Sequence, residues 1–281
     1  MKKVLLAGIS GYLGSYIAKE LRQRGYFVRG IARNPKKLKG IQVNEIIEAE
    51  VTRPNSIEDC CKNIDIVIST IGITKQKDGL TYLDVDYQAN MNVLHQAKES
   101  GVKKFIYVSV LNGENLRHLQ ICSAKEMFVD KLQNSGLDYC VIRPNGFFSD
   151  MAEFFTMAKK GRVYLFSNGE LKANPIHGED LARVCVDAIE NAYVEIEVGG
   201  PETLTQKEMA TSAFEILGTQ PKITYIPEWV RLFTLRLLKI FTGRKVYGPI
   251  EFFMTVMAMD MVAPEYGKHT LKNHFSSLNK Q

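Results

Sequence analysis

A glycine-spaced turn near the N-terminus constrains the fold more than any other feature of this chain. Residues 4–7 are all apolar and lead directly into Gly8-x-x-Gly11-x-x-Gly14. Beyond the turn, apolar residues recur at the spacing of one helix face, at positions 13, 17 and 21. A strand that passes through tight glycines into a helix offers backbone N–H groups to a phosphate. The turn therefore predicts an α/β fold that binds a dinucleotide, the alternative being a close-packed turn without a ligand.

The alternation of strands and helices continues through the first half of the chain. Further strands are predicted at residues 27–32, 45–49, 64–69, 104–109 and 139–142, and helices at about 55–62, 84–100 and 122–135. Strands that alternate with helices indicate βαβ units, and nearly continuous apolar strands indicate a sheet covered on both faces. We therefore predict a doubly wound parallel sheet, the Rossmann fold, over residues 1–145.

After residue 145 the pattern is less regular. Short strands are predicted near 162–165 and 174–177, and helices near 147–159, 178–191, 205–217 and 227–260. The helix at 205–217 should begin with a capping box formed by Thr205 and Glu208. We predict that residues 146–281 form a smaller, mainly helical, substrate-covering α/β region, some of whose segments can return to the main sheet.

The distribution of charge favours a small phosphorylated ligand over nucleic acid. The chain has a net charge of +5, but residues 1–40 contain ten Lys or Arg and one acid, Glu20. Nucleic-acid binding normally needs a broad basic face with interleaved aromatic residues, which the sequence past residue 40 does not provide. We expect no nucleic-acid partner.

The residues after the second predicted strand favour NADP(H) over NAD(H). NAD-binding folds tend to have an acid there, which accepts hydrogen bonds from the ribose hydroxyls. This chain instead has Arg33, followed by Lys36 and Lys37. A guanidinium can bind the 2′-phosphate bidentately. We predict Arg33 as the main phosphate ligand, with the two lysines either supporting it or serving as ordinary loop residues.

The cysteines and histidines predict neither disulfides nor a metal site. The five cysteines lack any C-x-x-C spacing, and their number is odd, which favours a reducing compartment. The five histidines lack paired metal-ligand spacing.

The N-terminal apolar run is too short for a secretory signal, and the longest apolar run near the C-terminus, 252–259, is too short to cross a bilayer. We expect a cytoplasmic location.

Several motifs together resemble the atypical short-chain dehydrogenase/reductase superfamily, including its NmrA-like members. They are the glycine turn, Arg33, Val108-Ser109, Lys125 and Arg143-Pro144. Residues 143–148, 175–182 and 199–205 are most similar to the divinyl chlorophyllide 8-vinyl reductase branch. The similarity extends over most of the chain.

The resemblance implies further cofactor contacts beyond the turn and Arg33. Glu50-Val51 would lie near the adenine, Thr70-Ile71-Gly72 near the ribose and phosphates, Lys125 at the nicotinamide ribose, and Pro144 to Phe147 at the nicotinamide end. The predicted cofactor-binding residues are thus Gly8, Ser10, Gly11, Tyr12, Leu13, Gly14, Arg33, Glu50, Val51, Thr70, Ile71, Gly72, Lys125, Pro144, Asn145 and Phe147.

The predicted catalytic residues are Ser109 and Lys125, which match the serine and lysine of the superfamily. Its catalytic tyrosine stands four residues before the lysine, on the same helix face, so that the ammonium can lower the phenol pKa. In this chain that position is Ile121, which cannot transfer a proton. Cys122, acidified by Lys125, or Tyr107 could replace the tyrosine; a packing role for each is the alternative.

Two functions remain open from the sequence. The first is an NAD(P)H-dependent oxidoreductase that transfers hydride to an apolar unsaturated or carbonyl substrate. The second is a non-catalytic NADP(H)-binding sensor, regulator or assembly factor of the NmrA-like type.

The segment 229–245 has five basic residues and no acid. For this segment we favour a role in a substrate pocket or in packing over contact with a membrane surface.

Overall fold

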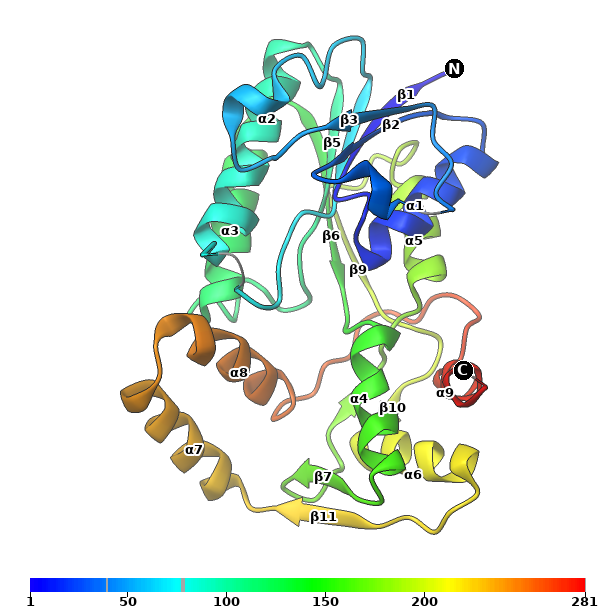
Figure 1. Ribbon diagram of the computed structural model, residues 1–281, viewed down its shortest axis with the longest axis vertical. Coiled ribbons are helices and arrows are strands. Elements are labelled where there is room, and N and C mark those ends of the chain that lie inside the picture. The colour runs from blue at the N-terminus through cyan, green and yellow to red at the C-terminus, as the bar shows by residue number, and fades with distance from the viewer. Residues whose placement is uncertain (39, 77–78, 281) are drawn as a thin grey trace. The chain divides into compact units, whose positions relative to one another are not determined.

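The computed structural model describes residues 1–38, 40–76 and 79–280, which form two compact units (Figure 1). The first unit comprises Met1–Arg143 and Leu181–Ile196, and the second comprises Pro144–Asp180 and Glu197–Gln281. The sequence places the boundary at residue 145. In the structure, the chain enters the second unit at Pro144 and returns to the first for residues 181–196.

The first unit contains the predicted Rossmann sheet. Its seven strands lie in the order β3-β2-β1-β4-β5-β6-β9, and the pairs among β1 to β6 are parallel. The strands are β1 (Lys3–Ala7), β2 (Phe27–Ala32), β3 (Glu45–Glu48), β4 (Ile66–Ser69), β5 (Lys104–Val108), β6 (Asp138–Pro144) and β9 (Glu195–Val198). The order reverses between β1 and β4, the point at which such sheets bind their ligands.

Helices cover both faces of this sheet. Helices α1 (Tyr12–Gln23) and α5 (Gly178–Asp187) lie on one face, and α2 (Asn90–Glu99) and α3 (Gln120–Gln133) lie on the other (Figure 1). Aromatic rings from β5 pack on α3, with the Tyr107 and Phe128 centroids 4.7 Å apart. The central strands β1, β4 and β5 are therefore buried almost throughout, as their apolar sequences predict, whereas the edge strands β3 and β9 are mostly exposed.

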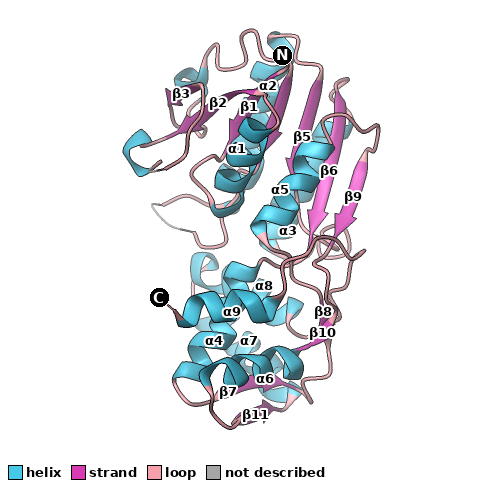
Figure 2. Cartoon of the chain, turned by 90° about the vertical axis from the view of Figure 1, so that its right-hand side faces the viewer, coloured by secondary structure: helices cyan, strands magenta, loops and turns pink. Residues whose placement is uncertain are grey.

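The second unit is mainly helical, with two short two-stranded sheets (Figure 2). Its helices are α4 (Phe148–Lys159), α6 (Gln206–Leu217), α7 (Glu228–Phe241), α8 (Arg244–Val256) and α9 (Leu271–Asn279). Strand β7 (Val163–Phe166) pairs in parallel with β11 (Ile223–Ile226), and β8 (Lys172–Ala173) pairs antiparallel with β10 (Leu204–Thr205). The predicted capping box is present, since the Glu208 N–H donates to Thr205 Oγ1 at 3.1 Å.

Some predicted elements differ from the structure. The helix expected at 55–62 is a 3₁₀ turn, Pro54–Ile57, followed by turns, because Asp59 and Asn63 adopt positive φ angles of 59° and 58°. The strand expected near 174–177 is replaced by β8, slightly earlier in the chain. The helical stretch 227–260 divides into α7 and α8, because Thr242 is extended and ends the first helix.

Candidate functional site

The glycine turn connects β1 to α1 through a backbone that a side chain would not fit. Gly8 has a φ of +90°, and a Cβ there would lie 2.5 Å from Thr70 Oγ1. A Cβ on Gly14 would lie 2.2 Å from the Gly8 carbonyl oxygen. The Gly11 N–H closes the turn by donating to that same oxygen at 2.9 Å. Glycine is therefore required at positions 8 and 14 for the close packing of helix and strand.

The N-terminus of α1 is arranged to receive an anion. Gly11 is the N-cap residue and, within the described segment 1–38, no side chain caps the helix. The first turn contains no acid, so no carboxylate competes for the positive end of the helix dipole. Backbone N–H groups at such a terminus bind phosphate.

The loop after β4 lies against the glycine turn. The Thr70 N–H donates to the Ala7 carbonyl at 2.9 Å, and the Thr70 hydroxyl lies 3.4 Å from the Gly8 carbonyl. Ile71 is buried, whereas Gly72 is exposed. The structure thus brings together the predicted phosphate-binding turn and the predicted ribose-binding loop at the reversal of strand order.

Arg33 follows the carboxyl end of β2 directly and is exposed. The next residues form a 3₁₀ turn, Pro35–Lys37, in which Asn34 Oδ1 accepts a hydrogen bond from the Lys36 N–H at 3.0 Å. The Lys36 side chain is also exposed, and the side chain of Lys37 lies outside the described part of the structure. Two exposed basic side chains, at 33 and 36, are therefore accessible to a phosphate from solvent.

Glu50 and Val51 follow β3 and are held by neighbouring side chains. Arg53 Nε lies 3.1 Å from Glu50 Oε2, and the Glu50 N–H donates to Ser56 Oγ at 2.6 Å. The carbonyl of Val51 accepts a hydrogen bond from Asn92 Nδ2 at 2.9 Å. The carboxylate at position 50 is therefore already paired with an arginine on the same loop.

Lys125 lies in a buried ion pair that the sequence analysis did not predict. Its Nζ is 3.0 Å from Asp86 Oδ1, and Asp86 is completely buried. Burial alone would lower the pKa of Lys125, but the neighbouring Tyr107 and Asp86 raise it above its ordinary value. A Cβ on Gly72 would lie 2.8 Å from Lys125 Nζ, so the ammonium is next to the predicted ribose-binding loop.

Asp86 belongs to a π-helix, Leu83–Ala89, that continues into α2. One turn later, Asn90 is also fully buried; it accepts from the Ser69 hydroxyl at 2.5 Å and donates to the Asp86 carbonyl at 2.9 Å. The sequence does contain a signal for these buried polar residues. Positions 86 and 90 lie on the same helix face as the buried residues Val93 and Ala97. Polar residues on a core face indicate a function or a buried network.

Ser109 belongs to a second buried network. Its hydroxyl donates to Glu126 Oε1 at 2.9 Å. Arg143 binds the same carboxylate with two nitrogens, at 2.7 and 2.9 Å, and its Nε lies 2.9 Å from Glu195 Oε2. The structure therefore ties the predicted catalytic serine to a bidentate ion pair between α3 and β6.

Neither proposed replacement for the tyrosine is acidified. Burial raises the pKa of Cys122 to about 12, although Lys125 opposes the shift. Burial also raises the pKa of Tyr107. The expected net acidification of Cys122 is wrong: Lys125 lowers the pKa of the thiol, but removal from water outweighs this effect. Ile121 is itself buried, and so fills its position as an ordinary core residue.

Pro144, Asn145 and Phe147 lie in the second unit. Asn145 is buried, and its amide donates to Asn174 Oδ1 at 2.7 Å and to the Met261 carbonyl at 2.5 Å. Phe147 forms an isolated bridge with Ile176 and is the N-cap residue of α4. Within this unit, Asn145 therefore joins segments that are distant in the sequence.

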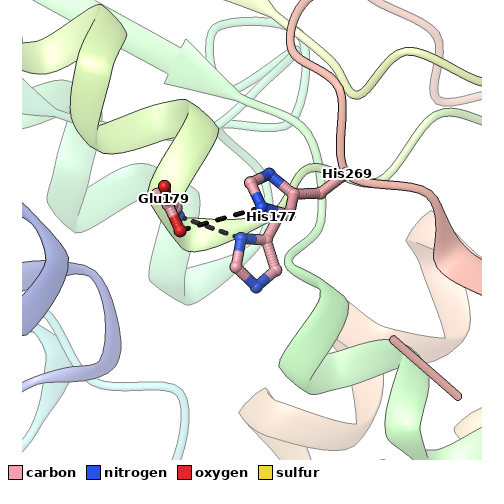
Figure 3. A group of neighbouring side chains, drawn as sticks. All are labelled: His177, Glu179 and His269. Carbon is pink, nitrogen blue, oxygen red and sulfur yellow. Dashed lines mark hydrogen bonds and ion pairs between the residues drawn. The ribbon is translucent and has the colours of Figure 1, made fainter. Parts of the chain in front are cut away.

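Three residues of the second unit form a cluster that could hold a metal ion, although the sequence predicts no metal site. The potential ligand atoms of His177, Glu179 and His269 lie within 4.8 Å of one another (Figure 3). The His177 and His269 rings stack at 4.3 Å, and His269 Nδ1 lies 3.0 Å from Asp180 Oδ2. A carboxylate on the second nitrogen is the usual way to orient a metal-binding imidazole. Sequence spacing does not predict the cluster, because His269 is distant in the sequence from His177 and Glu179.

Among the described residues, no helix combines the length and the apolarity that a membrane span requires.

The sheet order and the glycine turn define a Rossmann-type fold of the dinucleotide-binding class. The chain belongs to the NAD(P)H-binding family, whose family model matches residues 8–192. The predicted fold and the predicted NAD(P)(H) cofactor class are thus confirmed.

Relatives that cover most of the chain include two kinds of protein. The chloroplastic divinyl chlorophyllide a 8-vinyl-reductase of Arabidopsis thaliana is 28% identical, over 99% of this chain and 77% of its own length. A photosystem II assembly factor of Trieres chinensis is 25% identical, over 87% of this chain and 77% of its own length. These relatives confirm the resemblance identified from the motifs, and they include both an enzyme and an assembly factor.

Solved structures share the fold. An NADPH-dependent quinone oxidoreductase of Escherichia coli, in complex with NADPH, has a TM-score of 0.76 at 16% identity and covers 98% of this chain and 99% of its own. The Bordetella bronchiseptica enzyme WbmH, in complex with NAD⁺, has a TM-score of 0.69 at 19% identity and covers 98% of this chain and 96% of its own.

Proposed function

We propose that the protein is an NADPH-dependent reductase that adds hydride to a carbon–carbon double bond of an apolar substrate. The observation that carries this proposal is the uncapped N-terminus of α1 beside the reversal of strand order, with Arg33 exposed at the end of β2. The turn suits the diphosphate, and the guanidinium suits the 2′-phosphate of NADPH. An acid at position 33 would repel that phosphate.

The residue at position 121 supports a double bond as the target rather than a carbonyl. Reduction of a carbonyl builds negative charge on oxygen, which a nearby acid must protonate. Ile121 cannot do so, and burial raises the pKa values of Cys122 and Tyr107. In an electron-poor alkene, one carbon receives the hydride that NADPH supplies, and the other takes a proton from water. This reaction needs no acid aimed at a substrate oxygen.

The roles of the chain's own residues follow from this assignment. Lys125, held charged beside Asp86, would bind the nicotinamide ribose hydroxyls and orient the cofactor. Ser109 would position substrate only by giving up its bond to Glu126. We therefore assign orientation of the cofactor to Lys125 as its principal role, and a supporting role to Ser109.

Anaerobic turnover tests the proposal. NADPH absorbance at 340 nm is followed with vinyl-bearing tetrapyrroles, enones and quinones, and the product is checked for reduction of the double bond. We expect oxidation of NADPH with a vinyl tetrapyrrole, the class named for the plant relatives. Lys125→Ala should slow turnover, whereas Lys131→Ala, at an exposed position of the same helix, should not. Tight NADPH binding without oxidation by any of these substrates would contradict the reductase proposal.

Arg33 provides a separate test of cofactor choice. Arg33→Ala should weaken NADPH binding about 10- to 100-fold, since a hydrogen bond to a charged group contributes about 1.5–3 kcal/mol. NADH binding should change little, because NADH lacks the 2′-phosphate. Calorimetry with both coenzymes measures the two affinities. Equal losses of affinity for NADPH and NADH would refute the assigned role of Arg33.

A non-catalytic NADP(H)-dependent regulator is the second candidate. The observation in its favour is that both catalytic positions are occupied in buried contacts, Ser109 with Glu126 and Lys125 with Asp86. One group of relatives also consists of assembly factors. In this case NADPH binds without turnover, and Lys125→Ala leaves the redox state of the cofactor unaffected.

We also propose a reducing compartment such as the cytoplasm, because all five cysteines are buried and unbridged.

A further inference from the structure

Helix α7 presents its apolar side chains to solvent. Two of them, Trp229 and Phe241, are 67% and 80% exposed. The exposed apolar residues of the helix are Trp229, Leu232, Phe233, Leu237, Ile240 and Phe241. At 100° per residue, these positions form one continuous face. Soluble proteins rarely expose an apolar surface of this kind unless it binds a partner.

The opposite side of α7 is attached to its own unit. Arg231 is the buried residue of this fully described helix. Its Nε donates to Glu228 Oε1 at 3.0 Å, and its Nη1 donates to the Met254 carbonyl of α8 at 3.3 Å. The charged residue is therefore held inside the unit, while the aromatic residues face outward. These contacts fix which face α7 shows to solvent.

Positive charge accompanies the exposed apolar face. Arg236 lies within that face and Lys239 at its edge, and both side chains are exposed. On α8, Lys245, Val246 and Phe253 are exposed as well. The sequence has no acid from position 229 to position 250. Aromatic and aliphatic groups flanked by cations are complementary to a lipid surface with anionic head groups.

We propose that α7 docks the protein on an anionic membrane surface. Its 14 residues span about 21 Å at 1.5 Å per residue, which is too short to cross a bilayer but suits a helix lying in the plane of the interface. Trp229, Phe233 and Ile240 enter the boundary between head groups and acyl chains, and Arg236 and Lys239 bind lipid phosphates. Such binding would bring the reductase to substrates that partition into membranes, but it does not depend on turnover.

The single tryptophan of the chain, Trp229, is a built-in probe for this docking. Its fluorescence is recorded with vesicles of equal parts phosphatidylglycerol and phosphatidylcholine, and with vesicles of phosphatidylcholine alone. We expect a blue shift and protection from acrylamide with the anionic vesicles at low salt, and flotation of the protein with them. Higher salt should weaken the binding, since it screens the cations.

Variants separate the apolar from the electrostatic contribution. Phe233→Ser and Ile240→Ser should each weaken vesicle binding about tenfold, because each removes one buried apolar side chain from the interface. Arg236→Gln and Lys239→Gln should each weaken it about fivefold, and only with anionic lipid. Tyr164→Ser and Lys160→Gln, at exposed positions elsewhere in the same unit, are the controls and should leave binding unchanged.

Three results would overturn the proposal. Fluorescence and flotation unaffected by anionic vesicles would remove the membrane as occupant. A blue shift that depends on protein concentration without lipid would assign the face to a second copy of the chain. A blue shift caused by NADPH or by an apolar substrate, with no flotation, would make α7 a cover for the ligand. Since none of these readouts requires turnover, failure of the reductase proposal remains distinguishable.

Discussion

Helices α3 and α7 have the same length, 14 residues, but opposite patterns of burial. Helix α3 buries seven residues, among them Phe128 and Glu126, and leaves charged residues such as Lys131 in solvent. Helix α7 buries Arg231 and exposes Trp229 and its neighbours. The comparison shows that apolar spacing marks one face of a helix, whereas the surrounding structure decides whether that face is covered. Three predictions test this contrast, and a fourth concerns buried histidines of the second unit.

The largest expected effect concerns one phenylalanine from the interior of each helix. Phe128→Ala should lower the free energy of unfolding by about 3–5 kcal/mol, because it leaves a cavity between α3 and β5. Phe233→Ala should change it by no more than about 0.5 kcal/mol, because that ring is 54% exposed. Urea unfolding followed by circular dichroism measures both. A similar loss in the free energy of unfolding for the two variants would mean that the Phe233 ring is packed against other side chains.

The second prediction concerns charge. Glu126→Gln should lower the free energy of unfolding by about 3 kcal/mol, because it removes a partner of the buried Arg143. On the same helix, Asp130 pairs with Arg117 at 2.7 Å, but both side chains are over a third exposed. Asp130→Asn should therefore cost about 0–1 kcal/mol. The same unfolding experiment compares the two variants. A small effect of Glu126→Gln would show that the buried network contributes little to the free energy of unfolding.

The third prediction concerns cofactor affinity. Lys125→Met on α3 should weaken NADPH binding about tenfold, through loss of a charged hydrogen bond to ribose. Lys239→Met on α7 should leave NADPH affinity unchanged but weaken binding to anionic vesicles. Calorimetry and flotation, carried out on both variants, should give opposite results for the two lysines. If Lys239→Met weakens NADPH to the same extent, α7 is part of the cofactor site.

The smallest expected effect is on acid sensitivity. Burial lowers the pKa values of His177 and His274, so both are neutral in the folded state at pH values at which the unfolded chain begins to protonate. The unfolded chain then binds more protons, so the free energy of unfolding falls as the pH drops below about 6.5. His274→Phe should make this decline shallower, whereas His118→Gln, at an exposed position, should not. Unfolding curves at pH 7.5, 6.5 and 5.5 measure the slope.

The architecture of the first unit could be predicted because its signals are local. Apolar strands, the glycine turn and the face formed by Leu13, Ile17 and Leu21 each depend on neighbouring residues, and all are present. The missed elements have weaker local signals. Strand β9 has acids at both Glu195 and Glu197, and β11 has only four residues, which follow Pro221 and Lys222. These strands form because neighbouring strands are already in place.

The surroundings of the candidate catalytic residues could be predicted only in part. Ser109 and Lys125 were selected by motif, but their buried partners, Glu126 and Asp86, could not be assigned from spacing alone. The effect of burial on Cys122 was likewise inaccessible, because the desolvation of a thiol depends on everything packed around it. A motif identifies the residue types, and the pKa values follow from the surroundings.

The sequence by itself determined the strand, glycine turn and helix at the N-terminus, the absence of an acid at position 33 and the lack of a tyrosine at position 121. These depend on backbone sterics and on the chemistry of single side chains, which the order of residues specifies directly. The tertiary structure alone decided that Lys125 faces Asp86, that Ser109 faces Glu126, and that the aromatic side of α7 remains in water. Burial and pairing are properties of contacts between segments distant in the chain, so they arise only when the fold brings those segments together.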